Sequence, residues 1–179
     1  MDKNNQETEQ IQAKNATWLP GQVYKTPKYN CVHLKFLTDF LKATKTSVEE
    51  FAGSYSNSVV LRRQLKTDDM LLSKAKALFE KNGYTLHVSM KEKNPNTEND
   101  DVNIVFDVPN IVEDANPNIR FILDMLDYHG VNLNQIAEMI DVTPGAVWAW
   151  KRVDDIRISY MYRIKNALGC NLEFRVTKN

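Results

Sequence analysis

The stretch at residues 65–88 reads LKTDDMLLSKAKALFEKNGYTLHV, and 86 positions further on residues 151–174 read KRVDDIRISYMYRIKNALGCNLEF. The two stretches share an acidic pair, a serine, a glycine and a leucine: Asp68, Asp69, Ser73, Gly83 and Leu86 recur as Asp154, Asp155, Ser159, Gly169 and Leu172. Upstream the offset is 85, and Phe36, Asp39, Leu41 and Ala52 align with Phe121, Asp124, Leu126 and Ala137. The chain therefore repeats once, with one residue gained or lost between the two blocks, and we expect two copies of one small domain.

Charge divides the chain into four segments. Residues 1–30 form a polar N-terminal arm of net charge +1, and residues 31–93, the first copy, carry +4. Residues 94–117 form a connector of −6 that is rich in Asn, Asp and Pro, and residues 118–179, the second copy, carry +1. The neutral total therefore conceals a basic first copy and an acidic connector.

Composition limits the class of protein. The chain has 179 residues, of which 42% are hydrophobic, with 3 Trp, 7 Tyr and 7 Phe, and this is enough to build real cores. It contains no run of 18 apolar residues, and its polar N-terminus has no signal-peptide core, so we predict a cytoplasmic protein without membrane contact. Cys31 and Cys170 are far apart and flanked by apolar residues, which predicts reduced, partly buried thiols.

The apolar spacing in each copy predicts four short helices. In the second copy Asn132 or Asn134 can cap the second helix, and Thr143-Pro144 opens the third with a capping hydroxyl followed by a first-turn proline. Ser159 can cap the last helix, which Gly169 closes.

Alternating apolar residues predict three strands: Leu172 to Val176 in the second copy, Leu86 to Met90 in the first, and Val102 to Val108 in the connector. Isolated strands are marginal in water. We therefore expect one small sheet that fastens the two helical units together.

Residues 135–151, QIAEMIDVTPGAVWAWK, resemble the helix-turn-helix of the Cro/phage-repressor-like (XRE) family of DNA-binding proteins. Ala137 lies where the two helices cross, Asp141 occupies the turn where the family usually has Gly, and Val147 and Trp150 fall at the buried positions of the second helix. The resemblance covers residues 118–171 and, more weakly, residues 33–83. It implies a mainly α protein with two tandem lambda-repressor-like helix-turn-helix domains and a small β-sheet element between them.

The matching stretch of the first copy, residues 50–66, departs from the family pattern. Ala52 lies at the crossing and Leu61 is one anchor, but the turn is one residue shorter and no hydrophobe falls cleanly at both anchor positions. We therefore expect a degenerate helix-turn-helix. Its second helix nevertheless carries Arg62, Arg63, Gln64 and Lys66, residue types that pair with phosphates and purine edges.

The resemblance implies binding of double-stranded DNA in transcriptional control, as in bacteria and in mobile elements such as phages. The candidate DNA-binding residues are Ser58, Arg62, Arg63, Lys66, Thr143, Trp148, Lys151 and Arg152. The positions of the second copy that we expect to be exposed are Thr143, Pro144, Gly145, Trp148, Ala149 and Arg152, and they offer few groups for bidentate bonds to bases. The alternative is therefore a non-catalytic interaction or assembly module that retained the fold and binds a protein partner through Trp148 or the N-terminal arm.

Other functions have weaker support in the sequence. Asp68-Asp69 and Asp154-Asp155 each precede a helix, so we predict capping of that helix rather than catalysis or metal binding. The three histidines are scattered and no nucleophile is paired with a base, so we predict a non-enzyme without cofactor or metal. Trp18-Leu19-Pro20 is expected to dock the arm on the folded units. A pseudo-dimeric monomer and a homodimer both remain open.

Overall fold

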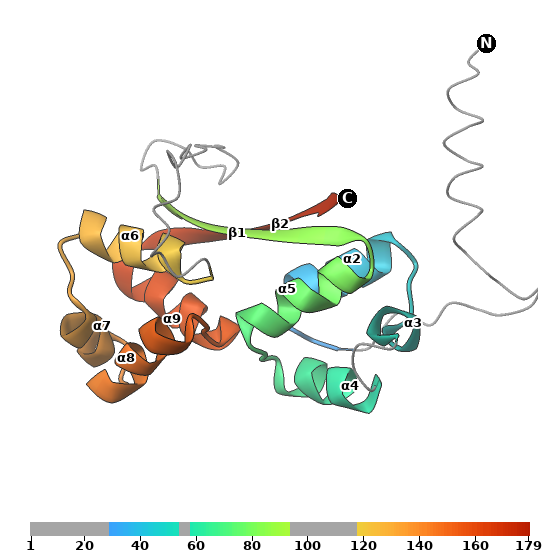
Figure 1. Ribbon diagram of the computed structural model, residues 1–179, viewed down its shortest axis with the longest axis horizontal. Helices are drawn as coiled ribbons and strands as arrows, with labels where there is room; N and C mark the ends of the chain where they lie inside the picture. The colour runs from blue at the N-terminus through green and yellow to red at the C-terminus, as the bar shows by residue number, and fades with distance from the viewer. Residues whose placement is uncertain (1–28, 54–57, 94–117) are drawn as a thin grey trace, which may run out of the picture.

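The computed structural model describes residues 29–53, 58–93 and 118–179, and within them the protein is mainly helical with one two-stranded antiparallel sheet (Figure 1). This confirms the expectation of a mainly helical protein with a small β-sheet. The predicted strand at Val102 to Val108 and the arm residues Trp18-Leu19-Pro20 lie outside the described residues.

The two halves carry the same elements in the same order. The first half contains α2 (Lys35–Ala43), α3 (Val48–Ala52), α4 (Ser58–Thr67), α5 (Leu72–Lys81) and β1 (Tyr84–Glu92). The second contains α6 (Arg120–Tyr128), α7 (Leu133–Met139), α8 (Pro144–Val153), α9 (Ile158–Leu168) and β2 (Cys170–Lys178). Equivalent elements start 85 residues apart before the connection between α3 and α4 and 86 residues apart after it, as the alignment of the two copies predicts.

The second helix of each half begins with a capping box. Ser47 accepts a hydrogen bond from the backbone N–H of Glu50, and the Glu50 side chain accepts one from the N–H of Ser47. Asn132 and Gln135 make the same reciprocal pair at α7, so Asn132 rather than Asn134 is the cap. Each box satisfies amide groups that the first helical turn leaves without partners.

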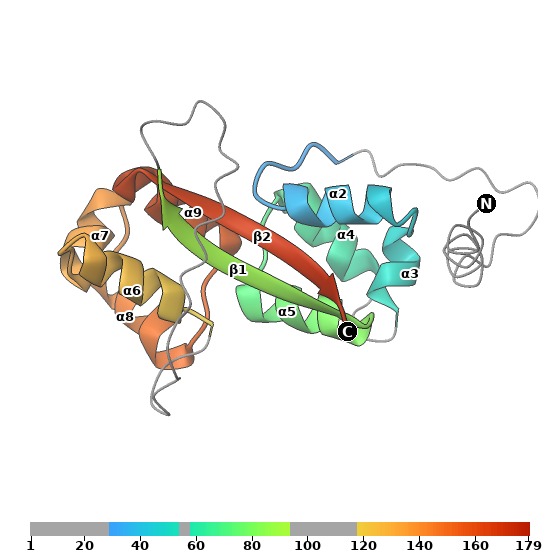
Figure 2. The ribbon, with the colours of Figure 1, turned by 90° about the horizontal axis from the view of Figure 1, so that it is seen from above.

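The sheet joins the halves rather than belonging to either. Strand β1 pairs antiparallel with β2 from Tyr84 opposite Lys178 to Glu92 opposite Cys170, so each half supplies one strand. Figure 2 shows the two strands lying across both groups of helices. Leu86 and Met90 are buried, whereas Thr85 and His87, on either side of Leu86, are exposed, as in a strand with one face on a core.

Two pairings place an approximate two-fold axis through the molecule. Val88 lies opposite Phe174, and the isolated bridge joins Leu71 to Arg157. In both pairs the partners are equivalent residues of the repeat, 86 positions apart. Residues that pair with their own counterparts lie on the axis that exchanges the copies, so the halves meet as the subunits of a symmetric dimer do.

The halves also exchange helix caps across this axis. Ser73 in the first turn of α5 donates its backbone N–H to Asp155 at 3.0 Å, and Ser159 in the first turn of α9 donates its N–H to Asp69 at 3.1 Å. The sequence-based assignment of Ser159 as a cap was wrong, because α9 begins at Ile158, so Ser159 is already inside the helix and its N–H is capped by Asp69 of the other half. Asp69 and Asp155 do cap helices, but not the helices that they precede.

The other member of each acidic pair binds the first helix of its own half. Asp68 accepts hydrogen bonds from the backbone N–H groups of Val32, His33 and Leu34 at 2.8 to 3.0 Å. Burial alone would raise the pKa of Asp68, but these N–H groups outweigh it and hold that pKa below its usual range. Asp154 likewise accepts hydrogen bonds from the backbone N–H groups of Asn118 and Ile119 at the start of α6. Here too the capped helix is not the following one.

Buried apolar residues of both halves form one continuous core. Phe36 of α2 stacks on Phe174 of β2 with ring centroids 4.2 Å apart, so an aromatic contact crosses between the copies. Cys31 and Cys170 are both free and buried, as predicted. No helix among the described residues is long and apolar enough to cross a membrane.

Candidate nucleic-acid interface

Helices α4 and α8 are equivalent elements, and Figure 1 shows both on the side of the molecule away from the β1–β2 sheet. The rest of each half fixes them in place. On the opposite side the sheet presents the polar side chains of its outer face. Helices α4 and α8, with the cap residue of α8, contain all the candidate residues from the sequence.

A tight turn joins α7 to α8. Asp141 adopts the left-handed conformation with φ of 55°, which aspartate tolerates better than most residues, and the N–H of Val142 donates to the carbonyl of Ala137 at 2.9 Å. Ala137 is fully buried. Its small side chain lets the two helices approach closely, as expected from the sequence.

Helix α8 begins as predicted. Thr143 is its N-cap and accepts a hydrogen bond from the N–H of Ala146 at 3.3 Å, while Pro144 occupies the first turn. Val147 is buried, and Trp150 is partly buried against Tyr160 at a centroid distance of 5.0 Å. The opposite side of α8 is exposed.

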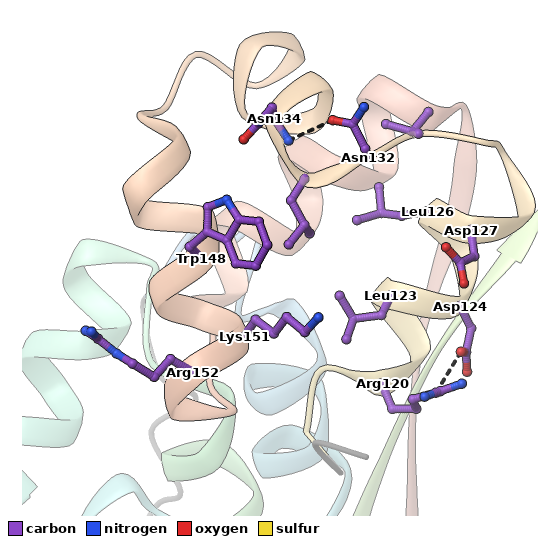
Figure 3. A pocket seen from close by; sticks show the side chains of 12 residues that line it. Arg120, Leu123, Asp124, Leu126, Asp127, Asn132, Asn134, Trp148, Lys151 and Arg152 are labelled. Carbon is purple, nitrogen blue, oxygen red and sulfur yellow. Dashed lines mark hydrogen bonds and ion pairs between the residues drawn. The ribbon is translucent and has the colours of Figure 1, made fainter. Parts of the chain in front are cut away.

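Seven residues from the cap to the end of α8 are exposed: Thr143, Pro144, Gly145, Trp148, Lys151, Arg152 and Val153. Trp148 is 52% exposed, and the Lys151 Nζ lies 5.7 Å from its ring centroid, a cation–π distance. Ala149, which the sequence placed among the exposed positions, is half-buried. Arg152 points away from Trp148 and Lys151 (Figure 3).

An open groove of about 780 Å³ lies between α8, α6 and the start of α7. Figure 3 shows Trp148 and Lys151 on one wall and Asp124 and Asp127 on the opposite one. Leu123 and other leucines of α6 and α7 supply apolar surface between the walls. Asp124 forms an ion pair with Arg120 at 2.7 Å.

This groove was not predicted from the sequence. Its acidic wall is the polar face of α6, which looks like an ordinary solvated face in the sequence. The signal available was the spacing of Asp124 and Asp127, which puts both carboxylates on one side of a helix. Only the packing of α6 beside α8 shows that this side lines a groove.

Helix α4 carries more cationic side chains than α8. Arg62, Arg63 and Lys66 are exposed, and Ser58, the first residue of the helix, is half-buried. Arg62 forms an ion pair with Glu49 of α3, a partner that sequence analysis did not identify. The three candidate basic residues of the first copy thus lie exposed on one helix.

The anchors of α4 differ from the expectation. Leu61 and Leu65 are both buried, at 1% and 2% exposure, so the helix does have two apolar anchors. They are four residues apart, whereas the anchors of α8, Val147 and Trp150, are three apart. The expectation of a degenerate motif rested on the three-residue spacing of the second copy. Either spacing puts two side chains on one helix face.

The thiols are poorly suited to nucleophilic chemistry. Burial, together with the nearby Asp68, raises the pKa of Cys31 to about 11, and its Sγ donates to the carbonyl of Leu65 at 3.2 Å. Burial also raises the pKa of Cys170. Both remain protonated at neutral pH. Among the described residues, no three His, Cys, Asp or Glu side chains are grouped to hold a metal ion.

Comparison of the chain with protein-family models, with curated proteins and with solved structures finds no significant match. The function must therefore be argued from the chain's own residues.

Proposed function

We propose that the protein binds double-stranded DNA through the face formed by α4 and α8 and acts in transcriptional control. The observation that supports this most is the pairing of equivalent helices on one face, each with an exposed basic side chain in its last turn. Lys66 and Arg152 occupy the same position in the two copies, 86 residues apart. A two-fold arrangement of exposed helices matches the approximate two-fold symmetry of a DNA duplex.

The charge of this face supports the same proposal. Arg62, Arg63 and Lys66 on α4 and Lys151 and Arg152 on α8 offer groups that contact phosphates and base edges. The exposed side chains of the two helices include no carboxylate, whereas the Asp124 and Asp127 carboxylates lie on α6. The cations of α4 outnumber those of α8, so we expect affinity to depend more on the first copy.

The test is duplex binding measured across a salt series. A protein that neutralises several phosphates loses about 0.9 log unit of affinity per contact for each log unit of salt. Arg62→Ala combined with Arg63→Ala should weaken binding by about 1 to 3 kcal/mol and flatten this dependence. Lys151→Ala combined with Arg152→Ala should do less.

A matched control removes two positive charges from the other side of the molecule. Arg175→Ala with Lys178→Ala changes exposed residues of β2 and should leave duplex affinity close to that of the parent. Equal loss in all three double variants would mean that only total charge matters, and the proposed face would be wrong.

A second candidate function is binding of a protein partner at the same face. Trp148 is 52% exposed beside the groove, and Val59 and Val60 of α4 are 66% and 45% exposed. Exposed apolar side chains on a helix are typical of protein contacts. Association that resists salt and that is abolished by Trp148→Ala would favour this function over DNA binding.

A further inference from the structure

We infer that the duplex bound by this chain consists of two inverted half-sites with different sequences, both covered by one chain. This inference rests on the proposed function. It adds the form of the target, which follows from the symmetry of the backbone and from the asymmetry of the side chains.

The backbone supplies the inverted arrangement. Val88 faces Phe174 and Leu71 faces Arg157, so the axis that exchanges the copies passes between α4 and α8. Two helices related by such an axis run in opposite senses on the face that they share. A duplex lying on that face meets them with its two strands exchanged, which is what an inverted pair of half-sites provides.

Shared contacts fix the distance between the two helices. The sheet, the exchanged caps of Asp69 and Asp155, and the hydrogen bonds from Leu72 to Ile156 and from Ile158 to Met70, each 2.9 Å, all join one half to the other. The two half-sites must therefore be separated by a fixed number of base pairs.

The side chains of α4 and α8 differ at two equivalent positions. Arg62 of α4 corresponds to Trp148 of α8, and Arg63 corresponds to Ala149. Lys66 and Arg152 are the equivalent pair that keeps its charge. Phosphates carry no sequence information, so Lys66 and Arg152 can make the same phosphate contact in both half-sites. Arg62 and Trp148 differ in chemistry, so they cannot contact the same bases.

The chemistry of these positions predicts what each half-site contains. Arginine forms bidentate bonds with the O6 and N7 atoms of guanine, so the half-site under α4 should contain a guanine. The first turns of α8 offer Pro144, Gly145 and the indole of Trp148, which present apolar surface and one donor. Apolar groups contact the methyl group of thymine, so the half-site under α8 should be richer in thymine.

The first experiment selects the best-bound sequences from random duplexes with the full-length protein. We expect two inverted half-sites of different sequence at one fixed spacing, bound by one chain per duplex. A direct repeat, a single half-site, or two identical halves would overturn the inference while leaving DNA binding intact. If no duplex is enriched and binding does not depend on salt, the proposed function fails as well.

The second experiment compares the selected duplex with two perfect palindromes, each built from one half-site taken twice. The selected duplex should bind about tenfold or more tightly than either palindrome, because a misread half-site contains several mismatched base pairs. Equal affinity for a palindrome would overturn the inference.

A gain-of-function variant separates recognition from folding. Trp148→Arg gives α8 the residue of α4 at this position, and Trp148 is exposed enough for the change to leave the core alone. The variant should move its preference several-fold toward the palindrome built from the guanine-containing half. Arg62→Trp should move it toward the other palindrome, and no shift in either variant would contradict the assignment.

Discussion

The first half of the molecule has an aromatic core, whereas the second half builds the same arrangement of helices around aliphatic residues. Phe51 packs against Phe40 and Phe79 with centroid distances of 5.3 and 5.2 Å. The positions equivalent to Phe51 and Phe40 are Ile136 and Met125, both buried. Cores of different composition can support one backbone because caps, turns and the positions of apolar residues are kept. The repeat therefore preserves the pattern of buried positions more than the identities of the residues that fill them.

The interface between the halves shows the same principle with polar groups. Lys76 of α5 donates to Asn118 at 2.9 Å, and at the equivalent place Tyr162 of α9 packs edge-on against His33 with centroids 5.0 Å apart. Burial lowers the pKa of Lys76 despite the nearby carboxylates of Asp154 and Asp155. One site uses a hydrogen bond and the other uses two rings, yet both connect the last helix of one half to the beginning of the first helix of the other.

The largest expected effect tests the two cores directly. Phe51→Ala should destabilise the protein by about 3 to 5 kcal/mol, and Ile136→Ala, its counterpart in the second half, by about 2 to 5 kcal/mol. Both residues are at most 2% exposed, so the difference between the two losses of stability reflects an aromatic ring in one half and a branched aliphatic side chain in the other. Urea unfolding would measure the two changes. We expect one transition in each variant because the halves share a core, and two separate transitions would mean that the halves unfold independently.

The next effect concerns the exchanged caps. Asp155→Ala and Asp69→Ala should each cost about 1 to 2 kcal/mol, because each leaves first-turn amides without their partner. Hydrogen exchange distinguishes a cross-half cap from a local one. Protection should fall in α5 when Asp155 is replaced and in α9 when Asp69 is replaced. Loss of protection confined to the half that carries the substitution would contradict the exchange.

A smaller effect depends on pH. The pKa of Asp68 is lower in the folded protein than its unfolded value of 3.8, so its ionised form adds stability above that value. This contribution disappears as the pH falls through the folded pKa. The urea midpoint of the parent should therefore drop more between pH 5 and pH 2.5 than that of Asp68→Asn, which keeps a capping oxygen and does not titrate. Identical drops would show that the backbone amides do not favour the carboxylate.

The smallest effects on stability belong to the residues proposed to read DNA. Trp148→Ala removes an exposed ring and its contact with Lys151, and Arg62→Ala removes a surface ion pair with Glu49. Each should change the free energy of unfolding by less than about 1 kcal/mol. Thermal unfolding would measure this. A larger loss at either position would identify a structural residue and weaken its use as a probe of binding.

Local features could be predicted from the sequence because the interacting residues are neighbours in the chain. The Thr143-Pro144 start of α8, the burial of Ala137 and the period-two alternation of both strands depend on residues a few positions apart. The exchanged caps could not be predicted from the sequence, because Asp69 and Ser159 are 90 residues apart. Backbone amides nearer to Asp69 in the sequence could donate the same capping hydrogen bond. The groove beside α8 could not be predicted either, because it depends on how α6 packs against the rest of its half.

Val88 pairs with Phe174, the equivalent residue of the other half, and this symmetry within one chain affects how the protein can evolve. In a homodimer each gene substitution is made twice, once in each subunit, so a residue that suits one side is imposed on the other. Here the two sides are encoded separately. A tryptophan at position 148 and an arginine at position 62 can each be selected on its own, and a single gene can evolve two different halves without a second subunit that must find its partner.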